Sequence, residues 1–412
     1  MRFLLGTAVA NLRRQKRRNF LTGIMIFLGV FNMVLVFSYA QSVERALTNG
    51  AVRGFTGHLQ IRPYSEKKIE VMYLETDGNF LTATGQLQEL LHKHPATAEV
   101  TPRLTFWGIL AGEETETGVA VAAIDPATDP LVFPGLKVTG GSYLTRPDGL
   151  LLGESTARTL GVKPGDELLL LTQTPDEYLN GINLVVEGLV KAEGISVFID
   201  YFAYMDIAAA RDLLYLSEDS SSFLAVSLAP GVKEKAVTEA YRSLTAGEGW
   251  LLRVDPWREV AGIFSGIIMA AKFLPGIGLG VTLLVIAAGI ANALLISLLE
   301  RTKEIGTLLA IGTKKREVLG LILLETGVLS GIAAGLGVFT GGVVVFWLSK
   351  VGVPAPVEAM EFVFGGPRLY YVFSLPVLAV SFAAIVLFSL AVAVFPARRA
   401  AALTPVEALR EE

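Results

Sequence analysis

The sequence predicts an α-helical membrane protein with four transmembrane helices, plus a large mixed α/β extracytoplasmic domain between helices 1 and 2. Hydrophobic residues make up 52% of the 412 residues, and the mean hydropathy is +0.53. This is more apolar than is usual for a soluble chain of that length. The apolar residues gather in four blocks, at 19–41, 261–299, 319–349 and 371–397. Between the first two blocks lie about 220 residues of ordinary soluble composition.

The placement of lysine and arginine predicts the orientation in the membrane. Residues 1–20 contain six bases and no acid, and the loop 300–318 contains five bases and three acids. We therefore expect both to face the cytoplasm, and four helices return the tail 398–412 to the same side. The segment 42–260 has 18 bases and 30 acids and is expected outside the cytoplasmic membrane. Its acidity argues against nucleic acid binding.

The N-terminal residues predict a helix lying on the membrane, followed by a helix that spans it. Within 1–18, apolar side chains share one helical face and bases occupy the other, which is typical of a cytoplasmic interfacial helix. The apolar stretch that follows is longer than the core of a signal peptide. We therefore expect a retained anchor, with transmembrane helix 1 and a stalk at 19–48.

The segment 49–258 predicts the extracytoplasmic α/β domain. Runs rich in β-branched residues, bounded by turn residues, are separated by stretches with helical periodicity. The hairpin Thr172–Asn183 is either a projecting docking loop or an ordinary turn. There is no cysteine, so no disulfide. We expect strands at 58–62, 119–123, 167–172 and 183–190, and helices at 81–94, 206–216 and 232–245.

The second apolar block is longer than a membrane requires. From 261 to 299 a helix would extend about 58 Å, against a hydrocarbon core of about 30 Å. Either the helix breaks at Pro275 and Gly276, or its first half rises above the bilayer as a stalk. Lys272 favours the stalk, because a charge at the centre of a membrane is costly. We therefore assign 259–299 to a stalk and transmembrane helix 2.

The third block, 319–349, predicts transmembrane helix 3 with small residues on one face. Glycines spaced four residues apart allow helix backbones to approach each other in lipid. This face would pack either within one subunit or against a second chain. An external loop at 350–370 and transmembrane helix 4 at 371–397 follow. The helix-packing residues are Gly327, Gly331 and Gly335.

Two polar residues lie within the apolar blocks. Glu325 is near the cytoplasmic start of helix 3, and an intramembrane acid is a candidate functional residue. Its proximity to the interface also allows a structural role, in which it reaches solvent or a basic group. Asn292 in helix 2 is expected to form a hydrogen bond between helices.

The loop 300–318 forms a charged cassette between two spanning blocks. Its central residues Ile305, Leu308, Ala310 and Ile311 repeat at helical spacing between two glycines. This pattern predicts a short amphipathic helix at the cytoplasmic face, with an apolar stripe available to a partner.

Together with the C-terminal run PARRAAALTPVEALRE at 396–411, this cassette resembles the MacB/FtsX family of ABC-transporter permeases. Length and domain order resemble the lipoprotein-releasing LolC/LolE branch most closely. The resemblance implies that Lys303–Ile311 is a coupling helix that docks on an ATPase. It also implies that the extracytoplasmic domain has two lobes, the second near 125–200. One departure is Leu309, where relatives usually have arginine. The ATPase-coupling residues implied are Glu300, Arg301, Lys303, Glu304, Ile305, Gly306, Leu308, Leu309, Ile311 and Gly312.

The resemblance also implies partners and a location. A separate ABC-type ATPase, in two copies, would bind ATP and Mg and drive movements of the extracytoplasmic domain. A second permease chain, identical or different, would complete a dimer in the cytoplasmic (inner) membrane. A lipoprotein or another hydrophobic substrate, membrane lipids and a periplasmic chaperone are the further partners expected. The alternatives are an efflux or cell-envelope permease of MacB/FtsX type and a membrane-anchored sensor or scaffold that transports nothing.

No catalytic, metal-binding or cofactor-binding residues are expected in this chain. His92 and His94 have no carboxylate or thiol nearby at the spacing of metal ligands, and solvated loop positions are expected for both. The stretch from Gly306 to Lys314 lacks the spacing of a phosphate-binding loop. We therefore expect a transporter membrane subunit without enzymatic activity of its own.

Overall fold

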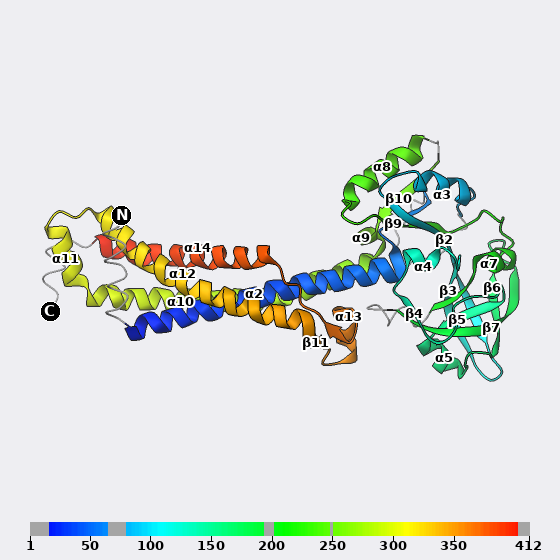
Figure 1. The fold of residues 1–412 in the computed structure, drawn as a ribbon, viewed down its shortest axis with the longest axis horizontal. Helices are drawn as coiled ribbons and strands as arrows, with labels where there is room; N and C mark the ends of the chain where they lie inside the picture. Colours follow the sequence, from blue (N-terminus) through cyan, green and yellow to red (C-terminus); the bar gives the residue numbers. More distant parts are fainter. Residues whose placement is uncertain (1–15, 65–79, 193–201, 248–249, 403–412) are drawn as a thin grey trace. The chain divides into compact units, whose positions relative to one another are not determined.

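The computed structural model describes residues 16–64, 80–192, 202–247 and 250–402 (Figure 1). The chain divides into two compact units. One, called the helical unit below, comprises Met1–Ser42, Ala270–Val353 and Tyr370–Glu412. The other, called the α/β unit, comprises Val43–Met269 and Pro354–Leu369. The expected interfacial helix falls almost wholly outside the described residues, which begin at Lys16.

The helical unit is built from long apolar helices. The four long ones are α2 (Lys16–Ala51), α10 (Gly262–Glu300), α12 (Lys315–Val351) and α14 (Leu375–Ala402), and α11 (Thr302–Ala310) lies between α10 and α12. Among the described residues, four helices are long and apolar enough to cross a membrane, and they coincide with the four predicted blocks. Their shared core contains Ile26, Val30, Ile286, Ile290, Ala333, Ala334 and Ile385.

Helix α10 does not break at its proline. It continues for 39 residues with Pro275 inside it, about 58 Å at 1.5 Å per residue. Of the two interpretations of the second apolar block, the break is therefore wrong. Helix α2 is also long, at 36 residues, and leads directly into the π-helical turn η1 (Val52–Thr56). The side chain of Lys272 lies outside those described.

The first lobe of the α/β unit is a four-stranded antiparallel sheet with two helices. The strands run in the order β10-β1-β9-β2, and the chain order strand–helix–strand–strand–helix–strand is that of a ferredoxin-like fold. Leucine and valine side chains from the sheet and both helices form its core. Its elements are β1 (Leu59–Pro63), α3 (Thr84–His92), β2 (Thr97–Ala111), β9 (Phe223–Leu228), α8 (Glu234–Gly247) and β10 (Leu252–Pro256).

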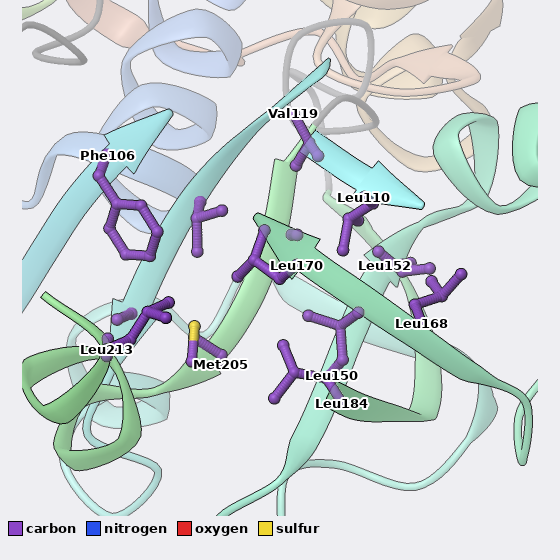
Figure 2. Close-up of a cluster of buried hydrophobic side chains, with 14 of the residues drawn as sticks. Phe106, Leu110, Val119, Leu150, Leu152, Leu168, Leu170, Leu184, Met205 and Leu213 are labelled. Carbon is purple, nitrogen blue, oxygen red and sulfur yellow. The ribbon is translucent and has the colours of Figure 1, made fainter. Parts of the chain in front are cut away.

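The second lobe is inserted between β2 and β9 and closes into a barrel. Strand pairs β2–β3, β3–β8, β8–β5, β5–β7, β7–β6 and β6–β2 complete the ring, and β4 adds to β7. Figure 2 shows its interior, filled by side chains that include Phe106, Leu110, Leu150, Leu170 and Met205. The strands are β3 (Glu116–Ile124), β4 (Leu136–Gly141), β5 (Gly149–Gly153), β6 (Glu167–Gln173), β7 (Leu179–Ala192) and β8 (Phe202–Asp206).

Short elements complete the structure. In the α/β unit they are α4 (Asp129–Val132), α5 (Glu154–Leu160), α7 (Ile207–Leu213) and α9 (Trp257–Val260). The loop between α12 and α14 contains β11 (Val353–Pro354), α13 (Glu358–Phe364) and β12 (Arg368–Leu369).

Most predicted elements of the α/β domain are confirmed. The four predicted strands correspond to β1, β3, β6 and β7, and the three predicted helices to α3, α7 and α8. The start of the second lobe, placed near residue 125, is wrong. The barrel begins at Arg103, because the long strand β2 pairs with β9 in its first half and with β3 in its second half.

Candidate functional site

The predicted amphipathic segment forms helix α11. Arg301 precedes the helix, and Ile311 follows it. Gly312 then adopts a φ of +97°, a conformation that favours glycine. At the start of the next helix, α12, the Lys314 backbone N–H donates to Glu317 Oε2 at 2.9 Å, which is one of the two hydrogen bonds of a capping box. Gly312 therefore lies at the turn between α11 and α12, whereas Gly306 lies inside α11.

The inner face of α11 packs against its own chain. Thr302, Ile305 and Gly306 are buried. Ile305 contacts a cluster formed by the end of α10, the start of α12 and the end of α14 (Leu298, Val318, Ile322, Ala397, Ala400 and Ala401). The alanines of the C-terminal run share one helical face, and their small side chains leave room for Ile305. The prediction that Ile305 belongs to a stripe available to a partner is therefore wrong.

The outer face of α11 is the part that remains accessible within this chain. Lys303, Glu304, Thr307 and Ala310 are exposed, and Leu308 and Leu309 are half-buried. Ile311 is 75% exposed, and Gly312 beside it is exposed as well. Of the predicted coupling residues, Ile311 is thus the large apolar side chain open to a partner, and Lys303 and Glu304 supply charge beside it. Glu300, the last residue of α10, is also exposed.

Arg301 and Glu325 form an ion pair between the start of α11 and α12. Arg301 Nη1 donates to Glu325 Oε2 at 3.1 Å and to Oε1 at 3.3 Å. Arg301 Nε also donates to Glu304 Oε2 at 3.1 Å. The Arg301 and Glu325 side chains are only 18% and 16% exposed. Glu325 therefore has the structural role that was one of its two predicted alternatives, and it connects α11 to α12.

A hydrogen bond between helices is present, although not at the predicted residue. Asn292 is exposed on α10, and no hydrogen bond from its side chain is found among the described residues. Instead, Asn32 Nδ2 on α2 donates to Thr282 Oγ1 on α10 at 3.1 Å. Sequence reasoning missed Asn32 because it considered the polar residues of the later helices only.

Close helix packing on α12 occurs beyond the predicted glycines. A Cβ added at Gly337 would lie 2.1 Å from Val30 Cγ1 and 2.8 Å from the Phe27 carbonyl oxygen. The close approach of α2 to α12 therefore requires glycine at position 337. Among the described residues, no atom lies within 4 Å of a Cβ added at Gly331 or Gly335, and one added at Gly327 meets Leu390 at an ordinary 3.6 Å. Packing inside one subunit is therefore not the role of Gly331 and Gly335. The alternative, a face for a second chain, stays a prediction.

Two histidines were considered as metal ligands. Among the described residues, no group of three or more His, Cys, Asp or Glu side chains could hold a metal ion. His94 Nδ1 accepts from the Ala96 backbone N–H at 3.3 Å, and its ring lies edge-on to Tyr241. His94 therefore packs against the fold, contrary to the solvated position predicted for it, whereas His92 is exposed.

Two known families match most of the chain. The MacB-like periplasmic core domain matches residues 20–244, more than half of the chain, and the FtsX-like permease C-terminal domain matches residues 276–405. The chain belongs to the MacB/FtsX permease family. The second match includes α11 and the C-terminal helix on which it packs. The two segments that carry the resemblance in sequence thus contact each other in the structure.

Curated relatives agree with this family. The uncharacterized ABC transporter permease YknZ of Bacillus subtilis is 24% identical over 98% of this chain and 98% of its own length. The macrolide export ATP-binding/permease protein MacB of Chlorobium phaeobacteroides is 26% identical over 99% of this chain but 60% of its own length. A solved periplasmic region of MacB from Actinobacillus actinomycetemcomitans is 13% identical, with 53% of this chain and 95% of that region covered. Its TM-score is 0.37, and we draw no conclusion from it.

The relatives differ in how much of their length this chain spans. It spans nearly all of YknZ but only 21% of the MacB protein of Rhodopirellula baltica, which is 32% identical over 39% of this chain. The chain is an ABC transporter permease of MacB/FtsX type, and the names of the MacB relatives include an ATP-binding part beside the permease. The apolar helices and the periplasmic-type domain indicate a membrane protein with an extracytoplasmic domain.

Proposed function

We propose that this chain is the membrane subunit through which a separate ATPase moves an extracytoplasmic domain. The observation that carries the proposal is helix α11. Its inner face is fixed by Ile305 and by the Arg301–Glu325 pair, and its outer face presents Lys303, Glu304 and Ile311. Because α11 packs against α10, α12 and α14, a displacement of α11 by a bound ATPase would also displace these three helices.

The connections within the chain favour mechanical transmission. Strands β1 and β10 are paired antiparallel, with Leu59 opposite Pro256. Strand β1 follows α2 and η1, and β10 precedes α9 and α10. Both helices are longer than the roughly 30 Å hydrocarbon core of a bilayer. A shift of either helix would therefore reach the first lobe directly through the backbone.

The substrate class and the other partners are part of the same proposal. A lipoprotein or another hydrophobic molecule extracted from the membrane suits a subunit that acts by moving an external domain. A second permease chain would complete a dimer in the cytoplasmic membrane, and a periplasmic chaperone would receive the substrate. The name of the MacB relatives favours the alternative of an efflux permease, since macrolide export is stated for them.

Two substitutions on opposite faces of α11 test the coupling role. Ile311→Asp should reduce the ATPase that copurifies with the full chain from its native membranes by about tenfold, as expected for an exposed apolar contact at the centre of an interface. The thermal stability of the chain should not change, because Ile311 is exposed. Ile305→Asp should instead lower the stability, because it places a carboxylate in an apolar cluster.

Val357 supplies the matched control for this experiment. It is an apolar residue, 57% exposed, in the α/β unit. Val357→Asp should leave both ATPase copurification and stability unchanged. Full copurification and full ATP-dependent activity of the Ile311→Asp variant would show that the outer face of α11 is not the coupling surface.

A further inference from the structure

The barrel lobe has an unusual outer surface. Along β2 and β6, Phe106, Leu110, Leu168 and Leu170 point into the core (Figure 2). Because side chains alternate along a strand, the intervening residues point outward. On an antiparallel sheet with one solvated face these residues are usually polar. Here the outward residues are apolar: Trp107, Ile109, Leu169 and Leu171.

These outward residues form one continuous surface. Ile109 lies directly opposite Leu171, and Ala111 lies opposite Leu169. On the next strand, Leu171 lies over Gly181, where an added Cβ would come within 2.8 Å of its Cδ2 atom. Trp107 is 56% exposed, Ile109 46%, Leu169 37% and Leu179, at the start of β7, 76%. We call Trp107, Ile109, Leu169, Leu171 and Leu179 the outer barrel patch.

The charged residues on the strands and hairpins of the patch are acidic. Glu116 lies opposite Ala111 at one end of β2, and Glu167 precedes Leu169 by two residues on the same face of β6. The strands and hairpins that form the patch, 104–124 and 164–185, contain seven acids and no lysine or arginine. All seven are exposed: Glu113, Glu114, Glu116, Asp166, Glu167, Asp176 and Glu177.

We propose that the outer barrel patch is a docking surface for a protein partner whose contact surface has an apolar centre bordered by lysine and arginine. An exposed group of large apolar side chains rimmed by polar ones marks an interaction site. Complementary charge selects the partner and discourages others. A second copy of this patch would bring seven carboxylates against seven, and anionic lipid headgroups would likewise be repelled. A protein with a basic rim satisfies both the apolar centre and the acidic border.

The proposal goes beyond ATPase coupling, because every residue of the patch lies in the α/β unit and α11 lies in the helical unit. The docking proposal and the ATPase-coupling proposal can therefore be contradicted by separate experiments. Loss of the patch would leave ATPase copurification intact, whereas Ile311→Asp would leave docking at the patch intact.

Site-specific photocrosslinking tests the proposal on the full chain in its native membranes. Ile109 is replaced by p-benzoylphenylalanine, and Leu251, 77% exposed on the first lobe, is replaced in the matched control. A product with one protein is expected from position 109 and not from 251. The double substitution Glu116→Lys and Glu167→Lys should reduce its yield by about tenfold, since like charges across an interface are strongly unfavourable. Mass spectrometry should find lysine or arginine beside apolar residues in the attached peptide.

Several outcomes would overturn the proposal. These are a product that the charge reversal leaves unchanged, an attached peptide without basic residues, a product that contains only this chain, a crosslink to lipid, or no product. Both glutamates are exposed, so the reversed variant should fold. Its thermal unfolding, compared with that of the parent chain, verifies this. A second reversal at the tip of the β2–β3 hairpin, Glu113→Lys with Glu114→Lys, should weaken the product in the same direction.

Discussion

Two arginine–carboxylate pairs, one in each unit, differ in how fully they are enclosed. In the α/β unit, Arg103 binds Asp129 with two parallel hydrogen bonds of 2.7 and 3.0 Å, and both side chains are 1% exposed. In the helical unit, Arg301 reaches Glu325 through a single nitrogen, and the two side chains are 18% and 16% exposed. The first pair is bidentate and buried, and its two parallel hydrogen bonds fix the relative orientation of the two side chains. The second keeps access to water and shares its arginine with Glu304, so it can rearrange at lower cost.

The surroundings of Arg103 explain why its pair is enclosed. Arg103 is the residue of β2 that pairs with Phe223 of β9 and with Ile124 of β3, where the first lobe passes into the barrel. Its guanidinium lies 3.5 Å from the centre of the Phe133 ring. Asp129 belongs to α4, so the ion pair fixes α4 to the point where the two lobes join.

A backbone contact fixes the same segment to η1, which follows the long helix α2. The Gly135 N–H donates to the Arg53 carbonyl oxygen at 3.0 Å, and a Cβ at Gly135 would lie 2.9 Å from that oxygen. Only glycine permits this approach. The segment from Asp129 to Gly135 therefore connects both lobes to η1, and we interpret the Arg103–Asp129 pair as part of a rigid joint. We expect the less enclosed Arg301–Glu325 pair to move more easily, and we call it the movable pair.

The largest effect is expected from breaking the enclosed pair. Asp129→Asn leaves Arg103 charged, buried and without its counter-charge, which should lower the unfolding free energy by about 3–5 kcal/mol. Thermal unfolding of the full chain measures this. The exposed pair Arg146–Asp148, with side chains 54% and 43% exposed, supplies the control. Asp148→Asn should cost no more than about 1 kcal/mol.

A double replacement separates charge burial from the geometry of the joint. Arg103→Met with Asp129→Leu removes both charges and fills similar volume, which restores stability in other buried pairs. Recovery of stability is expected here too. Equal, small losses for Asp129→Asn and Asp148→Asn would contradict the distinction drawn between enclosed and exposed pairs.

Neither ion pair could be predicted from the sequence, because the two residues of each pair are far apart along the chain. Hydropathy is a local property, so the four apolar blocks located the long helices. Closure of the barrel depends on pairing β2 with β6, about 60 residues later, and Pro102 and Gly108 within β2 are typical of strand ends. Helical periodicity located the apolar stripe of α11. It could not indicate that Ile305 packs against alanines of the C-terminal run.

A smaller effect on stability is expected from the movable pair. Glu325→Gln keeps a hydrogen-bond acceptor for Arg301 but removes the charge, so the unfolding free energy should fall by about 1 kcal/mol. The looser attachment of α11 should nevertheless reduce ATP-dependent activity of the complex more than it reduces stability. ATP hydrolysis and thermal unfolding, measured on the same preparation, give the comparison.

Glu304→Gln is the matched control for the movable pair. It removes the exposed partner of Arg301 and leaves Arg301–Glu325 in place. Because Glu304 also belongs to the outer face of α11, Glu304→Gln should lower activity slightly, and less than Glu325→Gln does. The charge-exchanged double variant, Arg301→Glu with Glu325→Arg, should recover part of the activity lost in Glu325→Gln. If stability and activity fall in parallel in every variant, the pair is a structural contact only.

The smallest effect is expected at His58, a half-buried titratable group of the α/β unit outside both pairs. Burial lowers the pKa of His58 from its ordinary value of 6.5, and its Nδ1 atom accepts a hydrogen bond from the Leu228 backbone N–H at 3.2 Å. The folded state therefore binds a proton less readily than the unfolded state, so stability is highest above the unfolded pKa and falls as pH decreases below it. His58→Asn keeps an acceptor near the Nδ1 position and cannot titrate. Thermal unfolding between pH 7 and pH 5 should show a smaller decrease for His58→Asn than for the parent chain. Identical pH profiles would mean that His58 has the same pKa in the folded and unfolded states. Its burial would then contribute nothing to the pH dependence of stability.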